Sequence, residues 1–193
     1  MLKSFSAAVI MLVFAGLAMQ VFLLSGCKKE QASSPSSITP DNSAKGPTGP
    51  AVQTALPPEG IQQLQRGIQD TKARDYDKAI REFSAVIVKY PNDSTAYNDR
   101  ASVYVLQHKF DKAKDDLNKA LQVDPNYAVT YYNFASLYAL QKQSDLALAS
   151  LDKALEMGFN DYDFLRADPD LANIRKHPEF RKILERHKVF VPK

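Results

Sequence analysis

The sequence predicts an all-α protein in which copies of one helical hairpin stack on each other. In the stretch Ser94 to Tyr127, small and large apolar residues recur at helical spacing in two runs, which is the pattern of two amphipathic helices. Residues 107–109 alone separate the two runs, so a tight turn joins the helices. Asp124 ends the second helix because it precedes Pro125, and a residue before proline avoids the α region. The stretch is therefore one complete hairpin.

The second observation is that the same marks return when the sequence is shifted by 34 residues in either direction. A chance amphipathic helix would not reproduce them, so we expect three hairpins, at residues 60–93, 94–127 and 128–161. Helices are expected at 61–73, 76–89, 95–107, 110–123, 128–141 and 144–157. The residues in register include Ala79, Ala113 and Ala147, then Tyr97 and Tyr131, Tyr104 and Tyr138, and Pro91 and Pro125.

This period resembles that of the tetratricopeptide repeat (TPR) family. The small residues Gly67, Ala101 and Ala135, which stand where the first helix of a pair crosses the second, also resemble the family pattern. The resemblance implies a right-handed superhelix of three repeats over 59–161. The first repeat departs from the family pattern at Asp70, where an aromatic residue is usual. The third has Gly158 where an Asp-Pro pair would end the helix, a kind of deviation typical of terminal repeats.

Each end of the repeat region has its own signal. Pro57, Pro58 and Glu59 suit the start of the first helix, since proline is favoured in a first turn and an acidic residue complements the helix dipole. Residues 162–193 do not follow the repeat and resemble the C-terminal extension of many bacterial TPR proteins. Capping helices are expected over residues 162–193, and one of them, at 178–187 with Phe180, Ile183, Leu184 and His187 on one face, is expected to close the exposed end of repeat three.

The N-terminal residues 1–26 resemble a bacterial lipoprotein signal peptide. An apolar run reaches Leu24 and is followed by Ser25, Gly26 and Cys27, the arrangement of a lipobox in which the cysteine is acylated and becomes the mature N-terminus. Two alternatives stay open: an uncleaved membrane-spanning anchor, since the run is long enough to cross a bilayer, and an unmodified thiol beside an ordinary signal peptide. In lipoproteins of enteric bacteria, aspartate directly after the acylated cysteine is associated with retention in the inner membrane. Lys28 occupies that position here, which favours the outer membrane.

Residues 27–58 are expected to be a lipidated cysteine followed by a disordered linker. About half of the residues after Cys27 are Ser, Thr, Pro or Gly, and none is aromatic. Such a segment cannot bury enough apolar surface to offset the entropy of ordering it. The linker is therefore predicted to tether the repeats to a membrane.

Charge and cysteine content exclude some classes of protein. Lys and Arg number 25 against 22 Asp and Glu, and both signs are interleaved through the repeats, so no basic field suited to nucleic acid is predicted. With one cysteine, an internal disulfide is impossible. The one local excess of positive charge is in residues 175–188, which we interpret as a solvated helix face.

The sequence contains no catalytic or cofactor motif. His108, His177 and His187 have no partner at ligand spacing, and structural roles are expected for each. The acidic pairs at 115–116 and 168–170 do not match paired catalytic acids, because adjacent acids on a helix point to different sides and Asp168 is expected to cap a turn. We therefore expect a non-enzymatic protein without metal or cofactor.

The TPR resemblance also implies a binding surface. Family members commonly hold a peptide or a partner helix in a concave groove lined by the first helix of each repeat. Subgroups that grip acidic peptide tails need Lys, Asn and Arg at places where Leu64, Ile68, Asp99 and Val129 stand here, and only Asn133 fits, so that ligand class is not expected. The groove positions in this sequence are Leu64, Ile68, Asn98, Ser102, Val105, Tyr132, Asn133, Ser136 and Ala139.

Three functional hypotheses follow. The first is a lipid-anchored adaptor of the bacterial cell envelope that faces the periplasm and binds another envelope protein. The second is an enzyme or glycan-binding module acting on peptidoglycan, suggested by the compartment and the basic C-terminal helix. The third is self-association through exposed repeat faces.

Overall fold

The computed structural model describes residues 56–189, which form eight α-helices and one short 3-10 helix with no strand among them. This confirms the expected all-α class. The signal peptide, Cys27 and nearly all of the linker lie outside the described residues. Within the described range, no helix combines the length and apolarity that a bilayer crossing requires.

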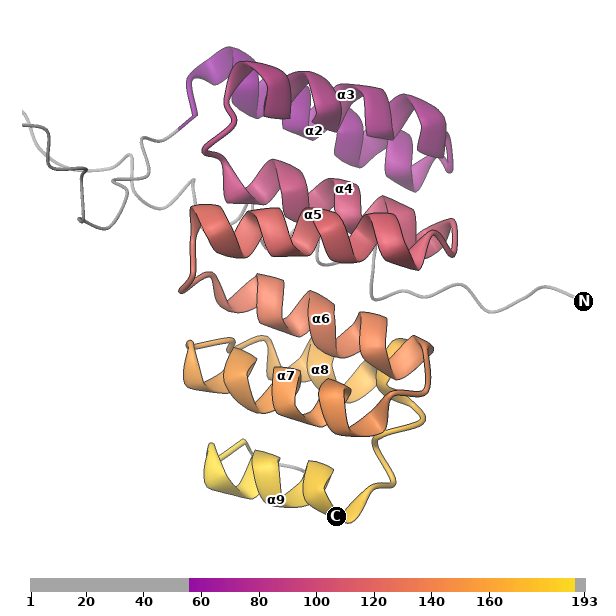
Figure 1. Cartoon of the computed structure of the whole chain (residues 1–193), viewed down its shortest axis with the longest axis vertical. Coiled ribbons are helices and arrows are strands. Elements are labelled where there is room, and N and C mark those ends of the chain that lie inside the picture. The colour runs from indigo at the N-terminus through magenta and orange to yellow at the C-terminus, as the bar shows by residue number, and fades with distance from the viewer. Residues whose placement is uncertain (1–55, 190–193) are drawn as a thin grey trace, which may run out of the picture.

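The helices stack in chain order along the long axis of the molecule (Figure 1). The second helices of the first two hairpins have the expected bounds, and the first helices begin or end within a few residues of the expectation. The elements are α2 (Pro58–Lys72), α3 (Tyr76–Lys89), α4 (Ser94–Leu106), α5 (Phe110–Val123), α6 (Ala128–Leu140), α7 (Ser144–Glu156), α8 (Tyr162–Ala167), η1 (Pro169–Leu171) and α9 (Pro178–Arg186).

Pairs of consecutive helices form the hairpins: α2 packs on α3, α4 on α5 and α6 on α7. Neighbouring hairpins meet through α3 and α4 and through α5 and α6. The first helices also contact one another, α2 with α4 and α4 with α6. We call the side of the stack formed by α2, α4 and α6 the first-helix face.

The turns inside the three hairpins share one backbone conformation. Arg74, His108 and Lys142 have φ values of 64°, 57° and 60°, in the left-handed region, and stand at the same register position. The amide of the residue after each of them bonds back to a carbonyl near the end of the first helix, for example Lys109 to Tyr104 at 2.8 Å. The regular sequence period therefore corresponds to a regular turn.

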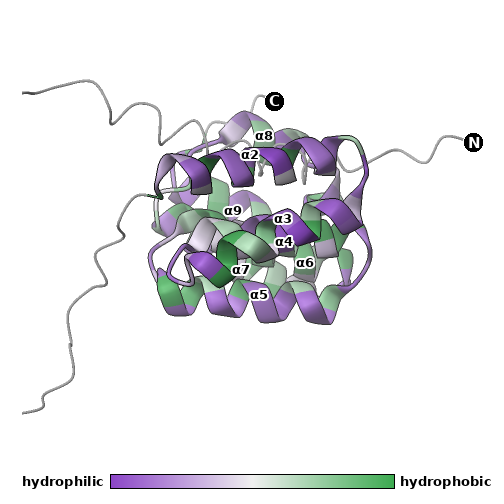
Figure 2. Cartoon of the chain, turned by 90° about the horizontal axis from the view of Figure 1, so that it is seen from above, coloured by the Kyte–Doolittle hydropathy of each residue, from purple (hydrophilic) through white to green (hydrophobic). Residues whose placement is uncertain are grey.

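Side chains between the helices form the hydrophobic core. Viewed along the stack in Figure 2, α2 and α5 lie on opposite sides and are largely hydrophilic, whereas α6 between them is mostly hydrophobic. Helices α3 and α6 illustrate the cause. Helix α3 buries Ala79, Phe83 and Val86 and leaves its remaining residues partly or fully exposed. Helix α6 instead buries residues around most of its circumference.

The C-terminal residues cover α6 and α7. Helix α9 packs on α7 and buries Phe180, Ile183 and Leu184, which confirms the expected capping helix. More than one capping helix was expected over residues 162–193, but the bounds of helix α8 were not. Helix α8 lies behind α6 and α7 in Figure 1, and the following η1 contacts α6. The extension therefore encloses repeat three from two directions.

Gly67 shows how closely the two helices of the first hairpin approach. A Cβ atom at this position would lie 2.5 Å from Cε1 of Phe83, whose side chain is completely buried. We expect Gly67→Ala to lower the free energy of unfolding by about 1–2 kcal/mol, because overpacking outweighs the helix propensity of alanine. Equilibrium urea unfolding measures this loss.

The second repeat supplies the matched rescue for Gly67→Ala. In that repeat Ala101 stands at the register position of Gly67. The second helix of the same hairpin carries Leu117 at the register position of Phe83. Combining Gly67→Ala with Phe83→Leu should recover most of the stability lost by the single change. A single variant as stable as the wild type would show that the hairpin tolerates a wider spacing than the structure has.

Candidate partner-binding site

The nine residues predicted to line the groove are all buried, with exposed fractions of 7% or less. Leu64 and Ile68 belong to the hydrophobic cluster of the first hairpin, and Val105 to that of the second. Their side chains therefore contribute to the core of the stack in this structure. Their role in binding a partner stays a prediction.

Asn98 joins the first helices of repeats two and three. Its amide nitrogen donates to the Ser94 carbonyl and to Oγ1 of Thr130, both at 2.9 Å, and its oxygen accepts from Nδ2 of Asn133 at 3.1 Å. Ser102 donates to the Asn98 carbonyl at 3.0 Å. The structure thus brings three of the predicted residues into one buried hydrogen-bond network that fixes α4 against α6.

Tyr132 anchors the C-terminal extension on the first-helix face. Its ring stacks on Phe159 at 4.2 Å between centroids and lies 5.5 Å from Phe164 of α8. Its hydroxyl donates to Oδ2 of Asp168 at 2.6 Å, and Ser136 donates to the same oxygen at 3.4 Å. No pattern in the sequence indicated this contact, which joins repeat three to a segment outside the repeat.

The extension also reaches the end of α6. Nδ2 of Asn173 donates to the Ala139 carbonyl at 2.5 Å. Burial raises the pKa of the Asp168 carboxyl, while hydrogen bonds from Tyr132 and from the Asp170 amide oppose that rise. The part of the first-helix face around Tyr132, Ser136 and Ala139 is therefore covered by the chain itself.

The remaining surface of the face lies over α2 and the beginnings of α4 and α6. Gln65 is exposed at the same register position as Asp99 and Asn133. Thr95, Tyr127 and Val129 are partly exposed, so they are among the side chains that an incoming partner can touch. This list was not predicted from the sequence.

Asp99 is a buried carboxyl group that the sequence analysis treated only as a mismatch to an acidic-peptide site. It is 4% exposed, and its Oδ2 atom has no hydrogen-bond partner among the described residues. Burial raises the pKa of Asp99 well above its usual range, and the charge of Asp93 raises it further. Ionisation of the Asp99 carboxyl group is therefore energetically unfavourable in the folded state.

We expect Asp99→Asn to raise the free energy of unfolding at neutral pH by about 1–3 kcal/mol, because it removes a buried charge without a partner. The folded pKa of Asp99 lies above its unfolded pKa, so the stability that this residue contributes is present in acid. It falls as the pH rises from the unfolded pKa, about 3.9, through the folded value. The gain in the variant should therefore be small at about pH 3.5 and larger at about pH 7.

Urea unfolding of both proteins at the two pH values checks this expectation. Asp115→Asn is the matched control, since Asp115 is exposed on α5 and its replacement should change stability little at either pH. A gain in Asp99→Asn that is equal in acid and at neutral pH would contradict the assigned cause.

The other candidates for chemistry have structural partners. His177 caps α9 by accepting from the Glu179 amide at 3.2 Å, and His108 lies in a left-handed turn, as expected. His187 was expected on the apolar face of the capping helix; it is instead at the helix end, with Nε2 2.7 Å from Oδ1 of Asp152. Asp168 caps η1 by accepting from the Asp170 amide at 2.9 Å. Over residues 56–189, no group of three His, Cys, Asp or Glu residues could hold a metal ion.

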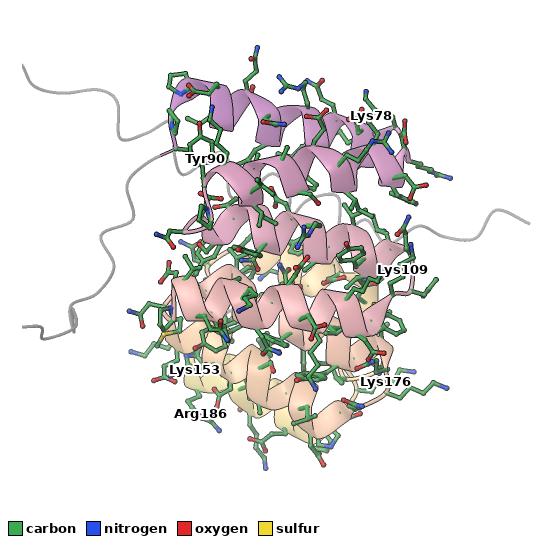
Figure 3. The ribbon with its side chains drawn as sticks, turned by 45° about the horizontal axis from the view of Figure 1, so that its top comes forward. Lys78, Tyr90, Lys109, Lys153, Lys176 and Arg186 are labelled. Carbon is green, nitrogen blue, oxygen red and sulfur yellow. The ribbon has the colours of Figure 1, made fainter. Side chains whose placement is uncertain are left out.

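The basic side chains of the C-terminal helix are largely paired. Arg181 contacts Glu185 at 2.8 Å, Lys182 contacts Glu179 at 3.2 Å, and Arg186 contacts both Glu179 and Asp152. In Figure 3 the labelled lysines and arginine lie along both sides of the stack and do not gather on one face. These pairs weaken the observation that suggested a glycan-binding module.

Comparisons with known proteins agree with this fold. Residues 94–158 match the family model described as a tetratricopeptide repeat. A comparison with curated proteins gave no match. The match and the fold support the tetratricopeptide repeat as the family of the repeat region, and this fold is typically a non-enzymatic interaction module.

Three solved structures have similar folds. The first TPR domain of Spaghetti (RPAP3) bound to the HSP90 peptide SRMEEVD is 21% identical with a TM-score of 0.52, covering 66% of this chain and 91% of that chain. The Sgt2 TPR domain of Aspergillus fumigatus is 21% identical with a TM-score of 0.55, covering 72% and 89%. The TPR2B domain of yeast Sti1 in complex with an Hsp70 peptide is 23% identical with a TM-score of 0.50, covering 66% and 98%.

Proposed function

We propose that this protein is a non-enzymatic adaptor that holds a peptide or helix of a partner protein against its first-helix face. The observation that carries the proposal is the stack of three TPR hairpins, whose fold is shared with domains that bind peptides of HSP90 and Hsp70. The open part of the face lies over repeats one and two, where Gln65 is exposed and Thr95 is partly exposed. A solenoid of this kind offers an extended surface of the size that a peptide needs.

The chemistry of the partner differs from that of the HSP90 peptide, which carries three acidic residues in the sequence SRMEEVD. Leu64, Ile68, Asp99 and Val129 stand where lysine, asparagine or arginine would be needed to hold such a tail. We therefore propose a partner segment without an acidic terminus.

Selection from a random peptide library displayed on phage tests this proposal, with the full chain in non-ionic detergent as target. An enriched peptide should bind with one-to-one stoichiometry. It should cross-link to a photoreactive residue placed at Gln65 on α2 but not to one at Lys119, which is exposed on α5. Recovery of no specific peptide, or cross-linking only at Lys119, would rule out the first-helix face as the binding surface.

We further propose that the adaptor is attached to the bacterial cell envelope, in the outer membrane facing the periplasm, through lipid on Cys27. The support is the sequence Leu24 to Cys27 after an apolar run, followed by a Ser- and Pro-rich linker. A lipoprotein carries more than one acyl chain and so stays attached, whereas a single chain binds a membrane only reversibly. The alternative is an inner-membrane protein held by an uncleaved N-terminal helix.

Replacement of Cys27 by serine distinguishes these two anchors. In a host with the lipoprotein pathway, a palmitate analogue should label the wild type and leave Cys27→Ser unlabelled. The variant should also accumulate as a slower-migrating precursor, because the acylation that precedes signal cleavage is lost. An uncleaved anchor would instead give no label in either protein and equal mobility for both.

A further inference from the structure

The strongest unexplained feature of the molecule is the carboxyl group of Asp99 near the start of α4. It occupies the register position of the exposed Gln65 and of Asn133 on the first-helix face. Asp99 is 4% exposed, and its Oδ2 atom accepts no hydrogen bond from any residue of the range 56–189. Buried carboxylate oxygens normally accept hydrogen bonds, so an acceptor is available at this position.

The groups around Asp99 supply no positive charge. Asp93, which caps α4 through a 2.8 Å bond from the Ala96 amide, adds a second acidic group whose charge acts on Asp99. Burial raises the pKa of the Tyr127 phenol, and the charges of Asp99 and Asp93 raise it further, while the side chain of Thr95 opposes the rise. We call Asp93, Thr95, Asp99 and Tyr127 the acidic cluster.

Arg100, the positively charged residue next to Asp99 in the chain, forms its contacts with other residues. Arg100 directs its guanidinium to both oxygens of Asp116 and to Ser84. Among residues 56–189, no ion pair includes Asp93 or Asp99. Two acidic groups therefore lie together with one unused buried acceptor and no counter-charge.

We propose that the acidic cluster is the specificity site of the first-helix face and accepts a lysine or arginine side chain of the bound peptide. The inference rests on the proposed adaptor function. A cationic side chain would donate to Oδ2 of Asp99 and offset the repulsion between Asp99 and Asp93. Asp93, Thr95 and Tyr127, the partly exposed members of the cluster, border the position where the cation enters.

An organic cation fits the cluster better than a metal ion. Hard divalent cations take six or more oxygen ligands, often from several carboxylates, whereas the cluster has two carboxyl groups, one of which is already occupied as a helix cap. An ammonium or guanidinium group needs only a few acceptors, and a peptide that lies along α4 can deliver it from one residue. The two donors, lysine and arginine, share this chemistry.

Peptide selection on the full chain in non-ionic detergent tests the inference, with wild type, Asp99→Asn and Asp115→Asn as parallel targets. Wild type and Asp115→Asn should enrich peptides with Lys or Arg at one fixed position, and Asp99→Asn should lose that preference while still folding. For one enriched peptide, fluorescence anisotropy should show about tenfold weaker binding to Asp99→Asn.

A double-mutant cycle and two added probes complete the test. Replacing the peptide's basic residue by glutamine should cost about as much as Asp99→Asn, with little further loss when both changes are combined. An N-acetylated peptide should bind as well as the free one, which assigns the cation to the side chain and not to the amino terminus. Calcium or magnesium titrated alone into the protein should show no binding that depends on Asp99.

The failures of the two proposals are distinguishable. Enriched peptides without a basic preference, or a preference that survives Asp99→Asn, would overturn the cation site and leave the adaptor function in place. Divalent-metal binding that is lost in Asp99→Asn would also overturn it, in favour of a metal site. No enriched peptide with any of the three targets would overturn the adaptor function and this inference together.

Discussion

Replacing Asp116 by alanine is expected to lower the free energy of unfolding by about 3 kcal/mol. Nε and Nη2 of Arg100 donate to the two oxygens of Asp116 at 2.8 and 2.7 Å, and Nη1 donates to Ser84 at 2.9 Å. The side chain of Asp116 is 8% exposed and that of Arg100 is 19% exposed. Removing the carboxylate leaves the guanidinium partly buried without a counter-charge, and urea unfolding at neutral pH measures the loss.

The third repeat offers the rescue for Asp116→Ala. Phe134 and Ser150 stand there in the register positions of Arg100 and Asp116. The double change Arg100→Phe with Asp116→Ser replaces the ion pair by that natural combination and should be within about 1 kcal/mol of wild type, since uncharged residues often substitute for a buried pair at little cost.

Glu185→Ala is the control for a merely exposed ion pair. It breaks the contact with Arg181 on α9, where the two side chains are 62% and 79% exposed, and should cost less than about 1 kcal/mol. If Asp116→Ala costs no more than Glu185→Ala, the Arg100–Asp116 pair does not hold α4 against α5.

The hairpins could be predicted from the sequence because their signals are local and repeated. The apolar register, the short turn and the residues that end the helices recur with one period, so the bounds of α3 and α5 were expected correctly. The bounds of helix α8 could not be predicted, because six residues carry too little periodicity to locate a helix. The position of α8 against Tyr132 depends on contacts between distant segments, which a single sequence does not display.

The candidate site could be predicted only as a face of the stack. The family register places residues on the first helices, and the structure does place Asn98 and Asn133 in contact there. Exposure at those positions could not be derived, because burial depends on how closely α4 approaches α6 and on what covers α6. Asp99 was visible in the sequence as an acid at a face position, but the absence of a counter-charge appears only when the directions of Arg100 and Tyr127 are known.

Tyr132→Ala is expected to lower the free energy of unfolding by about 3–5 kcal/mol, the range for removing a buried aromatic side chain. Tyr132 is completely buried and contacts Phe159 and Phe164 through its ring and Asp168 through its hydroxyl. The variant loses the anchor of the C-terminal extension as well as core volume. Urea unfolding should show the loss, and hydrogen exchange should show faster exchange in residues 162–175 than in α2 and α3.

Tyr132→Phe separates the hydroxyl from the ring. It keeps both aromatic contacts and removes one donor to Asp168, so it should cost only about 1–2 kcal/mol at neutral pH. Because the hydroxyl favours the charged form of Asp168, its loss should raise the folded pKa of that carboxyl further. The penalty should then be complete at pH values above the folded pKa of Asp168 in the variant, and it should shrink as the pH falls through that value and the lower folded pKa of the wild type. A Tyr132→Ala protein that is as stable as Tyr132→Phe, with an equally protected extension, would mean that α8 and η1 are held on repeat three by contacts other than this ring.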